Sequence, residues 1–239
     1  MLTVATWNCA HGRSVGPDLR RLLPTRRRQT LEAIGATLHA HAVDVVALQE
    51  LDGPSWWSGR FDHTRPVAEQ GGFGFGVHGH HVHWAGLRYG TALLSRRPLD
   101  EPASVRFAPS PPTPRKGFVV ARTALDGRPI DVISVHLDFA RPAARRSQLQ
   151  QLTDFLAGRD VPRVVMGDVN DEPGSADLLA FFAATGLRPA STAETTFPKL
   201  GRRLDVVLLS PELERVEQRV LPIDLSDHRP VVAKVRWAS

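Results

Sequence analysis

Eight polar side chains that can bind a cation or transfer a proton lie at the ends of short apolar segments in this sequence. They comprise four carboxylates, two amides and two histidines: Glu50, Asp168, Asp205, Asp227, Asn8, Asn170, His136 and His228. Polar turn residues are common at strand ends, so each residue by itself is weak evidence. Together, they could be gathered into one pocket by two sheets. Carboxylate and amide oxygens suit magnesium or manganese rather than zinc, so the set indicates chemistry on an anion with a hard cation.

The apolar segments have the length and the β-branched composition of strands. We expect strands at residues 2–7, 43–48, 91–95, 118–123, 130–136, 163–166, 204–209 and 231–235. The proline-rich segment 108–114 is expected to be a loop, because so many prolines cannot pair in a central strand. The glycine-rich segment 71–76 is expected to be flexible.

Three helices are expected between these strands. The first has a proline at its start and one apolar face, the second ends at a glycine, and the third has a serine N-cap and a glycine after its last turn. The first starts at Pro24-Thr25 and carries its apolar face to Leu38, the second has an apolar stripe from Leu149 to Leu156 closed by Gly158, and the third runs from Ala176 to Thr185 between Ser175 and Gly186. Many strands and few helices predict an α/β fold with two stacked sheets and the helices outside.

The chain has 239 residues, of which 42% are hydrophobic, so it can bury a core and fits a single domain over residues 1–239. No apolar stretch approaches the roughly 18 residues of a membrane span. The N-terminus lacks the features of a signal peptide, and there is one cysteine, so a cytoplasmic location is expected. That residue, Cys9, is expected to be a small buried apolar side chain rather than a reactive thiol.

The net charge of the chain is +5, which suits an anionic partner and makes nucleic acid possible. Nearly all of the basic residues are arginines, and their runs at 26–28, 145–146 and 202–203 are scattered. A solvated face is the better interpretation of each run. Charge therefore suits any anionic substrate without selecting one.

Seven short motifs, spread in order over nearly the whole chain, resemble those of the endonuclease/exonuclease/phosphatase superfamily, also called deoxyribonuclease-I-like. They are Thr-Trp-Asn at 6–8, Leu-Gln-Glu at 48–50, Tyr-Gly-Thr-Ala-Leu-Leu-Ser-Arg at 89–96, Val-His-Leu at 135–137, Gly-Asp-Val-Asn at 167–170, Arg-Leu-Asp-Val-Val at 203–207 and Ser-Asp-His-Arg-Pro-Val at 226–231. The resemblance implies a four-layer α/β sandwich, in which two stacked mixed β-sheets are flanked by helices. It places the active site at one end of the paired sheets.

The resemblance also implies roles for the metal-side residues and for the base. Glu50 is similar to the family's principal metal-binding carboxylate, with Asn8 beside it, and the cation would be Mg²⁺ or Mn²⁺. Asp227 would be a further metal-side carboxylate, although a structural turn aspartate is the alternative. Asp168 resembles the residue that orients and deprotonates the attacking water. Asn170 would point to the same side in an extended segment, where its amide could hold water or phosphate.

The remaining residues would act on the phosphate group. His228 resembles the histidine that stabilises the pentacovalent phosphorane or protonates the leaving group. Asp205 would fix the tautomer of His228 and favour its charged form. His136 is similar to the second histidine that contacts the phosphate.

The function implied by the resemblance is a divalent-metal-dependent phosphoesterase, in which water attacks a phosphodiester in line. The diester could belong to nucleic acid, a lipid head group or a small metabolite. One alternative is a phosphomonoesterase that acts on inositol phosphates or nucleotides. Another is a non-catalytic polyanion-binding domain, which would be expected to lack one of Glu50, Asp168, Asn170 or His228, whereas all four are present.

Two further clusters bear on specificity. The histidines at 78, 80, 81 and 83 could suggest a second metal, but no carboxylate or cysteine accompanies them, so a half-exposed strand or loop is the better interpretation. The pair Trp56-Trp57 could be a stacking platform or an apolar lip, or could be partly buried against a helix. The substrate-binding residues stay open.

Overall fold

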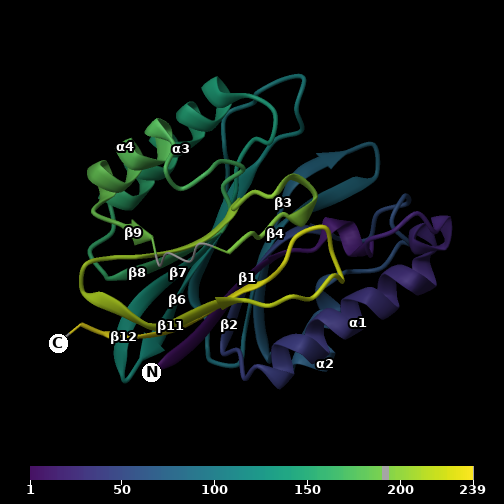
Figure 1. Cartoon of the computed structure of the whole chain (residues 1–239), viewed down its shortest axis with the longest axis horizontal. Coiled ribbons are helices and arrows are strands. Elements are labelled where there is room, and N and C mark those ends of the chain that lie inside the picture. The colour runs from purple at the N-terminus through teal and green to yellow at the C-terminus, as the bar shows by residue number, and fades with distance from the viewer. Residues whose placement is uncertain (190–193, 239) are drawn as a thin grey trace.

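The computed structural model describes residues 1–189 and 194–238, and their strands form two mixed six-stranded sheets that pack face to face. Helices cover both outer faces, so the molecule is a four-layer α/β sandwich, as predicted (Figure 1). Among the described residues, no helix combines the length and the apolar composition that crossing a bilayer requires.

The first sheet has the strand order β11-β12-β1-β2-β4-β3. Its strands are β1 (Leu2–Asn8), β2 (Val45–Asp52), β3 (Phe75–Trp84), β4 (Leu87–Ser95), β11 (Leu213–Val220) and β12 (Val231–Trp237). β1 and β2 are parallel, with Asn8 opposite Gln49. Because parallel strands end at the same edge of a sheet, this register brings Asn8 and Glu50 together.

The second sheet has the order β5-β6-β7-β8-β10-β9. Its strands are β5 (Asp100–Arg106), β6 (Gly117–Leu125), β7 (Arg128–His136), β8 (Arg163–Asp168), β9 (Arg188–Pro189) and β10 (Asp205–Leu209). In the parallel pair β7 and β8, His136 lies opposite Asp168, and in the antiparallel pair β8 and β10, Asp168 lies opposite Asp205. Strand register alone therefore places three predicted site residues side by side.

Four α-helices in the described residues cover the sheets: α1 (Pro24–Ala40) and α2 (Thr64–Gly71) on the first sheet, and α3 (Pro142–Ala157) and α4 (Ala176–Thr185) on the second (Figure 1). Buried apolar residues form three clusters, one between the sheets and one beneath each helix pair. In the four-layer arrangement, each interior strand therefore contributes to two cores. This explains why those strands are apolar on both faces.

The three predicted helices are confirmed, and their ends follow from local chemistry. Proline occupies the first turn of α1 and of α3, where its missing N–H would have no helical partner. The hydroxyl of Ser175 accepts a hydrogen bond from Leu178 N at the start of α4. Gly186 ends this helix with φ of 69°, in the left-handed region that glycine adopts without strain.

Strands β5, β9 and β11 and the helix α2 were not among the predicted elements, and for β3 the prediction left a half-exposed strand and a loop open at residues 78–83. The four strands are the edges of the two sheets. All of β5 except Val105 is exposed, and β11 alternates little, so neither has the apolar pattern of a buried strand. Parts of the glycine-rich segment 71–76 belong to regular elements, because Gly71 ends α2 and β3 begins at Phe75. The proline-rich segment 108–114 is a loop, as predicted.

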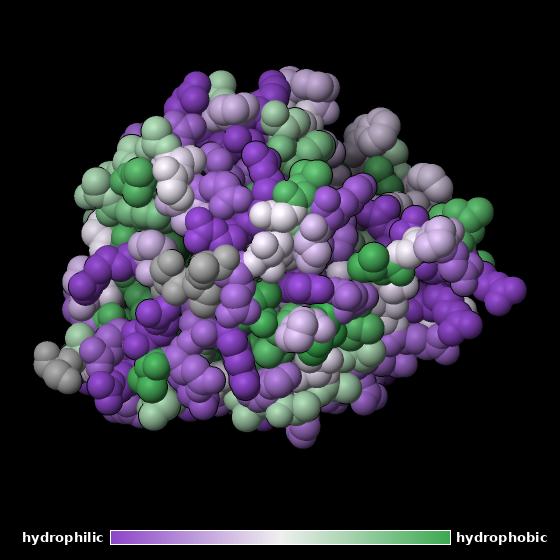
Figure 2. Space-filling view, viewed as in Figure 1, coloured by the Kyte–Doolittle hydropathy of each residue, from purple (hydrophilic) through white to green (hydrophobic). Residues whose placement is uncertain are grey.

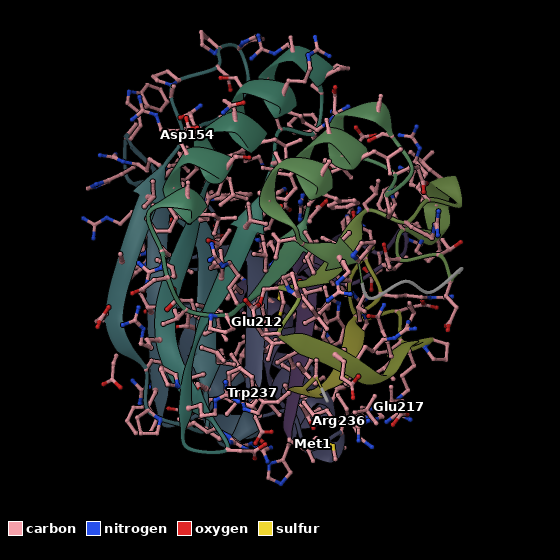
Figure 3. All side chains as sticks on the ribbon, turned by 90° about the vertical axis from the view of Figure 1, so that its left-hand side faces the viewer. Met1, Asp154, Glu212, Glu217, Arg236 and Trp237 are labelled. Atoms are coloured by element: carbon pink, nitrogen blue, oxygen red, sulfur yellow. The ribbon has the colours of Figure 1, made fainter. Side chains whose placement is uncertain are left out.

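The chain termini are held at one end of the sandwich, on the hairpin that joins β6 and β7. The amino group of Met1 lies 2.7 Å from Asp126 Oδ1, and Trp237 Nε1 donates to Leu125 O at 3.0 Å. Figure 3 shows Met1 and Trp237 close together at this end, and Asp154 on the outer side of the helix layer. Since Met1 precedes β1 and Asn8 ends it, the candidate site lies at the opposite end of the sheets.

Candidate active site

Asp168, the last residue of β8, is the centre of the candidate site, and its side chain is almost completely buried. Asn8 Nδ2 donates to Asp168 Oδ2 at 2.9 Å, and the backbone N–H of Asn170 donates to Oδ1 at 2.9 Å. Nε2 of His136 and Nε2 of His228 lie 3.6 and 3.8 Å from the same Oδ2. The structure therefore brings six of the predicted residues into one cluster, once Asp205 behind His228 is included.

Burial raises the pKa of Asp168 to about 7, because a charged carboxylate is poorly solvated there, and the nearby charge of Asp205 also raises it. The charge of His228 and the hydrogen bonds from Asn8 and Asn170 act in the opposite direction. A carboxyl group with a pKa near neutrality can both accept and release a proton at physiological pH.

His228 is oriented from two sides. Its Nδ1 donates to Asp205 Oδ2 at 2.8 Å, while its backbone carbonyl accepts a hydrogen bond from Trp7 Nε1 at 2.9 Å. Burial lowers the pKa of His228, but the carboxylates of Asp205, Asp168 and Asp227 outweigh burial and raise it to about 10. The ring is therefore an imidazolium at neutral pH, and its Nε2–H faces Asp168.

His136 stands beside a buried lysine that the sequence did not identify as a site residue. Lys116 Nζ lies 3.1 Å from Nε2 and 3.3 Å from Nδ1 of His136. Burial lowers the pKa of His136 well below its usual value, and the charges of Lys116 and His228 lower it further. Burial also lowers the pKa of Lys116, although Glu50, Asp168 and Asp138 raise it. The available signal was composition, because Lys116 is one of few lysines in an arginine-rich chain.

Glu50 lies in β2, at a bulge between Gln49 and Leu51 in the pairing with β4. Its φ of 53° is in the left-handed region, which costs a residue with a side chain about 1 kcal/mol or more. Burial raises the pKa of Glu50, but the charges of His11, Lys116 and His228 together bring it below the usual value. Glu50 is therefore an ionised carboxylate in a predominantly cationic surrounding.

Asn170 and Asp227 differ from the simplest expectation. Asn170 has a φ of 51°, so the segment after Asp168 turns rather than continuing extended, and that part of the prediction was wrong. Its side-chain Nδ2 donates to Leu137 O at 3.0 Å. Asp227 is exposed, and its Oδ1 accepts from Ser226 Oγ at 3.2 Å. Asp227 acts on the site by raising the pKa of its neighbour His228.

The donor set of this site fits a cation. Among the described residues, Asp168, Asp205 and His228 are buried and bring one potential ligand atom each to within 4.8 Å of one another. The imidazolium of His228 has no lone pair to offer, so the two carboxylates are the ligands available in this group. Asp205 Oδ1 is buried without a hydrogen-bond partner in the described chain, and such an orphaned carboxylate oxygen suits a cation or an ordered water. Glu50 and Asn8 supply further oxygens from the first sheet.

Two more residues missed by the sequence analysis, His11 and Asp52, lie next to Glu50. His11 Nε2 is 3.4 Å from Glu50 Oε2, and His11 Nδ1 is 3.0 Å from Asp52 Oδ1. Trp57 and Tyr89 pack edge-on against the His11 ring, with centroid distances of 4.6 and 5.0 Å. A signal was present, since Asp52 follows Glu50 by two residues and His11 follows Asn8 by three.

The structure also places the histidine cluster and the tryptophan pair. The four histidines lie in strand β3, so of the strand and the loop that were expected, the strand is found. In the described part of the chain they do not form a group of three metal ligands. His81 is buried, with its Nε2 at 2.9 Å from Thr91 Oγ1. Trp56 is exposed and donates to Ala85 O, whereas Trp57 packs on the site residue His11. Cys9 is fully buried, and burial raises the pKa of its thiol, so it is the small buried side chain that was expected.

Comparison with known proteins shows the family and the fold of the chain. Residues 5–228 match the Endonuclease/Exonuclease/phosphatase family. No curated protein sequence gives a significant match. Solved structures with the same fold include an endonuclease/exonuclease/phosphatase from Beutenbergia cavernae DSM 12333, with 22% identity and a TM-score of 0.75 over 99% of this chain and 71% of that one.

Two other similar structures carry different activities in their names. The first is a mannosyl-6-phosphatase from Bacteroides thetaiotaomicron VPI-5482, with 18% identity and a TM-score of 0.74 over 99% of this chain and 100% of that one. The second is sphingomyelinase C from Streptomyces griseocarneus, with 20% identity and a TM-score of 0.70 over 100% of this chain and 99% of that one. At such identities the likeness shows a common fold. The match over residues 5–228 shows that this chain belongs to the endonuclease/exonuclease/phosphatase family.

Proposed function

We propose that this protein is a divalent-metal-dependent phosphoesterase, in which water attacks the phosphorus of a phosphodiester in line. The observation that carries the proposal is the pairing of Asp168, a buried carboxylate whose pKa is raised towards neutrality, with the imidazolium of His228 at 3.8 Å. One group can take a proton while the other stabilises negative charge. Members of the family act on phosphate esters, and hydrolysis of such an ester needs a base and a cationic group of this kind.

In the proposed reaction, Asp168 accepts a proton from water while the water oxygen forms a bond to phosphorus. The bond between phosphorus and the leaving alcohol's oxygen breaks, and this oxygen takes up a proton. Asn8 and the backbone of Asn170 hold the Asp168 carboxylate through one hydrogen bond to each of its oxygens. His228 directs its Nε2–H at the phosphate oxygens or at the leaving oxygen, and Asp205 keeps it charged.

Glu50 and Asn8 would hold the cation, with Asp227 as a further carboxylate on that side. Oxygen ligands favour Mg²⁺ or Mn²⁺. When bound, the cation neutralises phosphate oxygens and the charge that develops on the leaving oxygen. Asn8 Oδ1 also accepts a hydrogen bond from Ala10 N at 3.0 Å. Together with the bond from Nδ2 to Asp168, this contact fixes the orientation of the Asn8 amide.

A phosphomonoesterase is the second candidate, and Lys116 is the observation that favours it. A phosphomonoester carries up to two negative charges. Lys116 adds a buried cation beside His136, and the nearby charges of Glu50 and Asp168 raise the pKa of this lysine. Inositol phosphates and nucleotides are such substrates. A non-catalytic polyanion-binding domain is disfavoured, because Glu50, Asp168, Asn170 and His228 are all present.

Nucleic acid as the diester is supported by arginines at the start of α1 and in the segment before it. Arg20, Arg21 and Arg26 line a pocket of about 400 Å³ that Leu225, three residues before His228, also lines. None of the three forms an ion pair with a carboxylate of the described chain. In Figure 2, hydrophilic side chains crowd the right-hand end of the molecule, where this segment and the start of α1 lie.

We further propose that residues 1–239 form a single domain and that the protein acts in the cytoplasm. Both proposals rest on the length of the chain and on its single cysteine. A length of 239 residues fits one sandwich, and the one cysteine is buried, which suits a reducing compartment.

The experiment that tests the function is hydrolysis of a phosphate-ester panel with Mg²⁺, Mn²⁺ or chelator, using the wild type and Asp168→Asn. The panel holds single-stranded DNA, plasmid DNA, RNA, sphingomyelin, inositol phosphates, nucleotides and a chromogenic diester. Metal-dependent turnover that is lost in Asp168→Asn supports the proposal. Turnover that persists in the variant, or in chelator, contradicts it. A protein that binds polyanions in a salt-dependent way and hydrolyses none of the panel would be the binding domain instead.

A further inference from the structure

We propose that His11 is a nitrogen ligand of the cation that Glu50 binds, and that Asp52 holds His11 in position for it. This inference rests on the proposed function, because it concerns the same cation. It adds a ligand of a different chemical type to the oxygens that the sequence identified. The hydrogen bonds, the backbone and the packing of the His11 ring all support it.

The hydrogen bond to Asp52 determines which ring nitrogen of His11 is free. An ionised carboxylate is only an acceptor, so the 3.0 Å contact places the proton on His11 Nδ1. Nε2 is the nitrogen left to face the site, and a cation that binds there takes the place of any proton on it. This nitrogen lies 3.4 Å from Glu50 Oε2. Two ligand atoms that are each about 2.1 Å from one ion are about 3.0 to 3.4 Å apart, so the spacing suits a shared cation.

Asp52 is placed to orient His11 rather than to bind the cation itself. Its side chain is completely buried, and its second oxygen, Oδ2, lies 3.9 Å from His63 Nδ1. Burial lowers the pKa of His63 to about 4, so this ring is neutral, and its Nε2 lies 3.2 Å from Ser58 O, where its single N–H can donate. Asp52 is therefore left as the partner of His11. Metal-binding histidines commonly donate their other N–H to a carboxylate in this way, which fixes the ring and makes it a better ligand. Asp52 is therefore a positioning residue.

The backbone around His11 has the strain that accompanies functional positions. Ala10, His11 and Gly12 have φ of 44°, 58° and 73°, three consecutive residues in the left-handed region. Arg27 Nη1 donates to His11 O at 2.8 Å, and Arg13 Nε donates to Ala10 O at 2.9 Å. The two hydrogen bonds from these guanidinium groups stabilise a left-handed turn that costs Ala10 and His11 backbone energy.

Aromatic packing fixes the ring itself. Trp57 and Tyr89 contact the His11 ring edge-on, and the Arg27 guanidinium carbon lies 5.3 Å from the Trp57 ring centroid. The ring is thus enclosed by two aromatic side chains, by Asp52 on one nitrogen and by Glu50 on the other. These contacts hold the ring in one orientation, which is what a histidine that binds a cation through its other nitrogen requires.

A nitrogen ligand changes which cation the site prefers. Imidazole binds Mn²⁺ more strongly than Mg²⁺, which favours oxygen ligands and retains its water. We therefore expect Mn²⁺ to bind more tightly than Mg²⁺, and the difference to shrink in His11→Gln. Glutamine keeps much of the polar character of histidine but offers no imidazole nitrogen.

The first test is spectroscopic, with Mn²⁺ as the probe and the full chain as the sample. Pulsed electron paramagnetic resonance detects the coupling of a ligand ¹⁴N to bound Mn²⁺. The expected result is a ¹⁴N coupling in the wild type that is lost or reduced in His11→Gln. The matched control is His63→Gln, which removes another buried histidine, behind Asp52, and should keep the coupling. An unchanged coupling in His11→Gln, or none in wild-type protein with Mn²⁺ bound, would overturn the inference.

The second test is calorimetric titration of Mn²⁺ and Mg²⁺ into the wild type, Asp52→Asn and His11→Gln. We expect Asp52→Asn to weaken Mn²⁺ binding by about 10- to 100-fold, the range for a residue that positions a ligand. Thermal melting of the metal-free proteins checks that the variants fold. If both variants fold and bind Mn²⁺ as tightly as the wild type, His11 is not a ligand, and the inference fails.

The two proposals fail separately. Metal-dependent hydrolysis that requires Asp168, with an unchanged ¹⁴N coupling in His11→Gln, keeps the proposed function and overturns the nitrogen ligand. A His11-dependent coupling in a protein that hydrolyses no ester supports the ligand and counts against the function.

Discussion

Asn8 Nδ2 donates a hydrogen bond to Asp168 Oδ2 at 2.9 Å, and this bond joins the last residue of β1 in one sheet to the last residue of β8 in the other. The carboxylate at the centre of the site is therefore oriented by both sheets. A second connection runs beneath it, where Gln49 Nε2 donates to Ser134 Oγ at 3.2 Å. The geometry of the site consequently depends on how the two sheets pack against each other.

Asp168→Asn should lower kcat by about 10²- to 10⁴-fold, the usual contribution of a general base. Asparagine has nearly the same shape and cannot take the proton from water. The measurement is kcat on the best ester of the panel, with circular dichroism to show that the fold is kept. Because asparagine is neutral, the variant should melt at a temperature no lower than the wild type, and kcat near the wild-type value would remove Asp168 as the base.

Glu50→Gln should raise the metal concentration needed for half-maximal activity, with a smaller effect on kcat at saturating metal. The neutral amide gives up the charge that attracts a divalent cation. Titration of activity with Mg²⁺ and Mn²⁺ measures this concentration. As a comparison, Glu69→Gln removes a carboxylate that pairs with Arg65 on the surface of α2 and should change nothing. An unchanged metal requirement in Glu50→Gln would place the cation elsewhere, such as at Asp168, Asp205 and His228.

The pH dependence of kcat/KM should rise through the pKa of Asp168, which is about 7 before a cation binds and lower with one bound, and should fall near the pKa of His228, about 10. Asp168 must be ionised and His228 protonated. Asp205→Asn removes the strongest carboxylate influence on His228, so the alkaline limb should move to lower pH and kcat should fall. If the alkaline limb does not move in Asp205→Asn, loss of the proton from His228 is not its cause.

Lys116→Met should reduce kcat/KM for a phosphomonoester more than for a diester, by about tenfold, which corresponds to about 1.4 kcal/mol. The physical reason is that a monoester dianion gains more from the buried cation beside His136 than a monoanionic diester does. The measurement compares p-nitrophenyl phosphate with bis-p-nitrophenyl phosphate in wild type and variant. Lys234→Met, on a lysine of β12 that pairs with Glu217, is the control. Equal losses on both substrates would argue against a monoesterase.

Replacement of Arg20, Arg21 and Arg26 by Gln should weaken the salt dependence of binding to single-stranded DNA. The slope of log K against log salt should fall by about 0.7 for every phosphate that the variant no longer neutralises. Fluorescence anisotropy of a labelled oligonucleotide measures K, with Arg65→Gln as a control for the removal of one surface charge. If the slope is unchanged, the pocket these arginines line does not hold nucleic acid.

Stability should fall in acid, and His81 should account for part of the loss. Burial lowers the pKa of His81 to about 3, and the charges of His78 and Lys116 lower it further. A histidine whose folded pKa lies below its unfolded value of about 6.5 contributes stability above pH 6.5 and loses it as pH falls. Between pH 8 and pH 5 the loss is about 2 kcal/mol for this residue.

Urea unfolding at pH 8 and at pH 5 measures this loss as a change in the free energy of unfolding. The dependence should be weaker by about 2 kcal/mol in His81→Gln, whose amide can still bond Thr91 Oγ1. His83→Gln, on the same strand but exposed, should keep the wild-type dependence. An equal pH dependence in His81→Gln would show that His81 does not remain neutral on folding.

The sequence by itself determined the interior of the fold. The eight strands that it predicts are β1, β2, β4, β6, β7, β8, β10 and β12, which are the strands flanked by neighbours on both sides. Interior strands lie between a helix layer and the other sheet, so they are apolar throughout and show in composition. Edge strands such as β5 are exposed and need no apolar pattern, so only pairing with β6 makes that segment a strand.

The site divides in the same way. The sequence predicted eight site residues, because strand ends and family motifs mark them locally: Asn8, Glu50, His136, Asp168, Asn170, Asp205, Asp227 and His228. Only the tertiary structure adds their unpredicted neighbours, because these depend on what meets across the sheets and turns. Lys116 meets His136 because the next residue, Gly117, pairs with His136 across β6 and β7. The His11 ring lies between Asp52 and Glu50 because of a left-handed turn, a conformation that no residue pattern specifies.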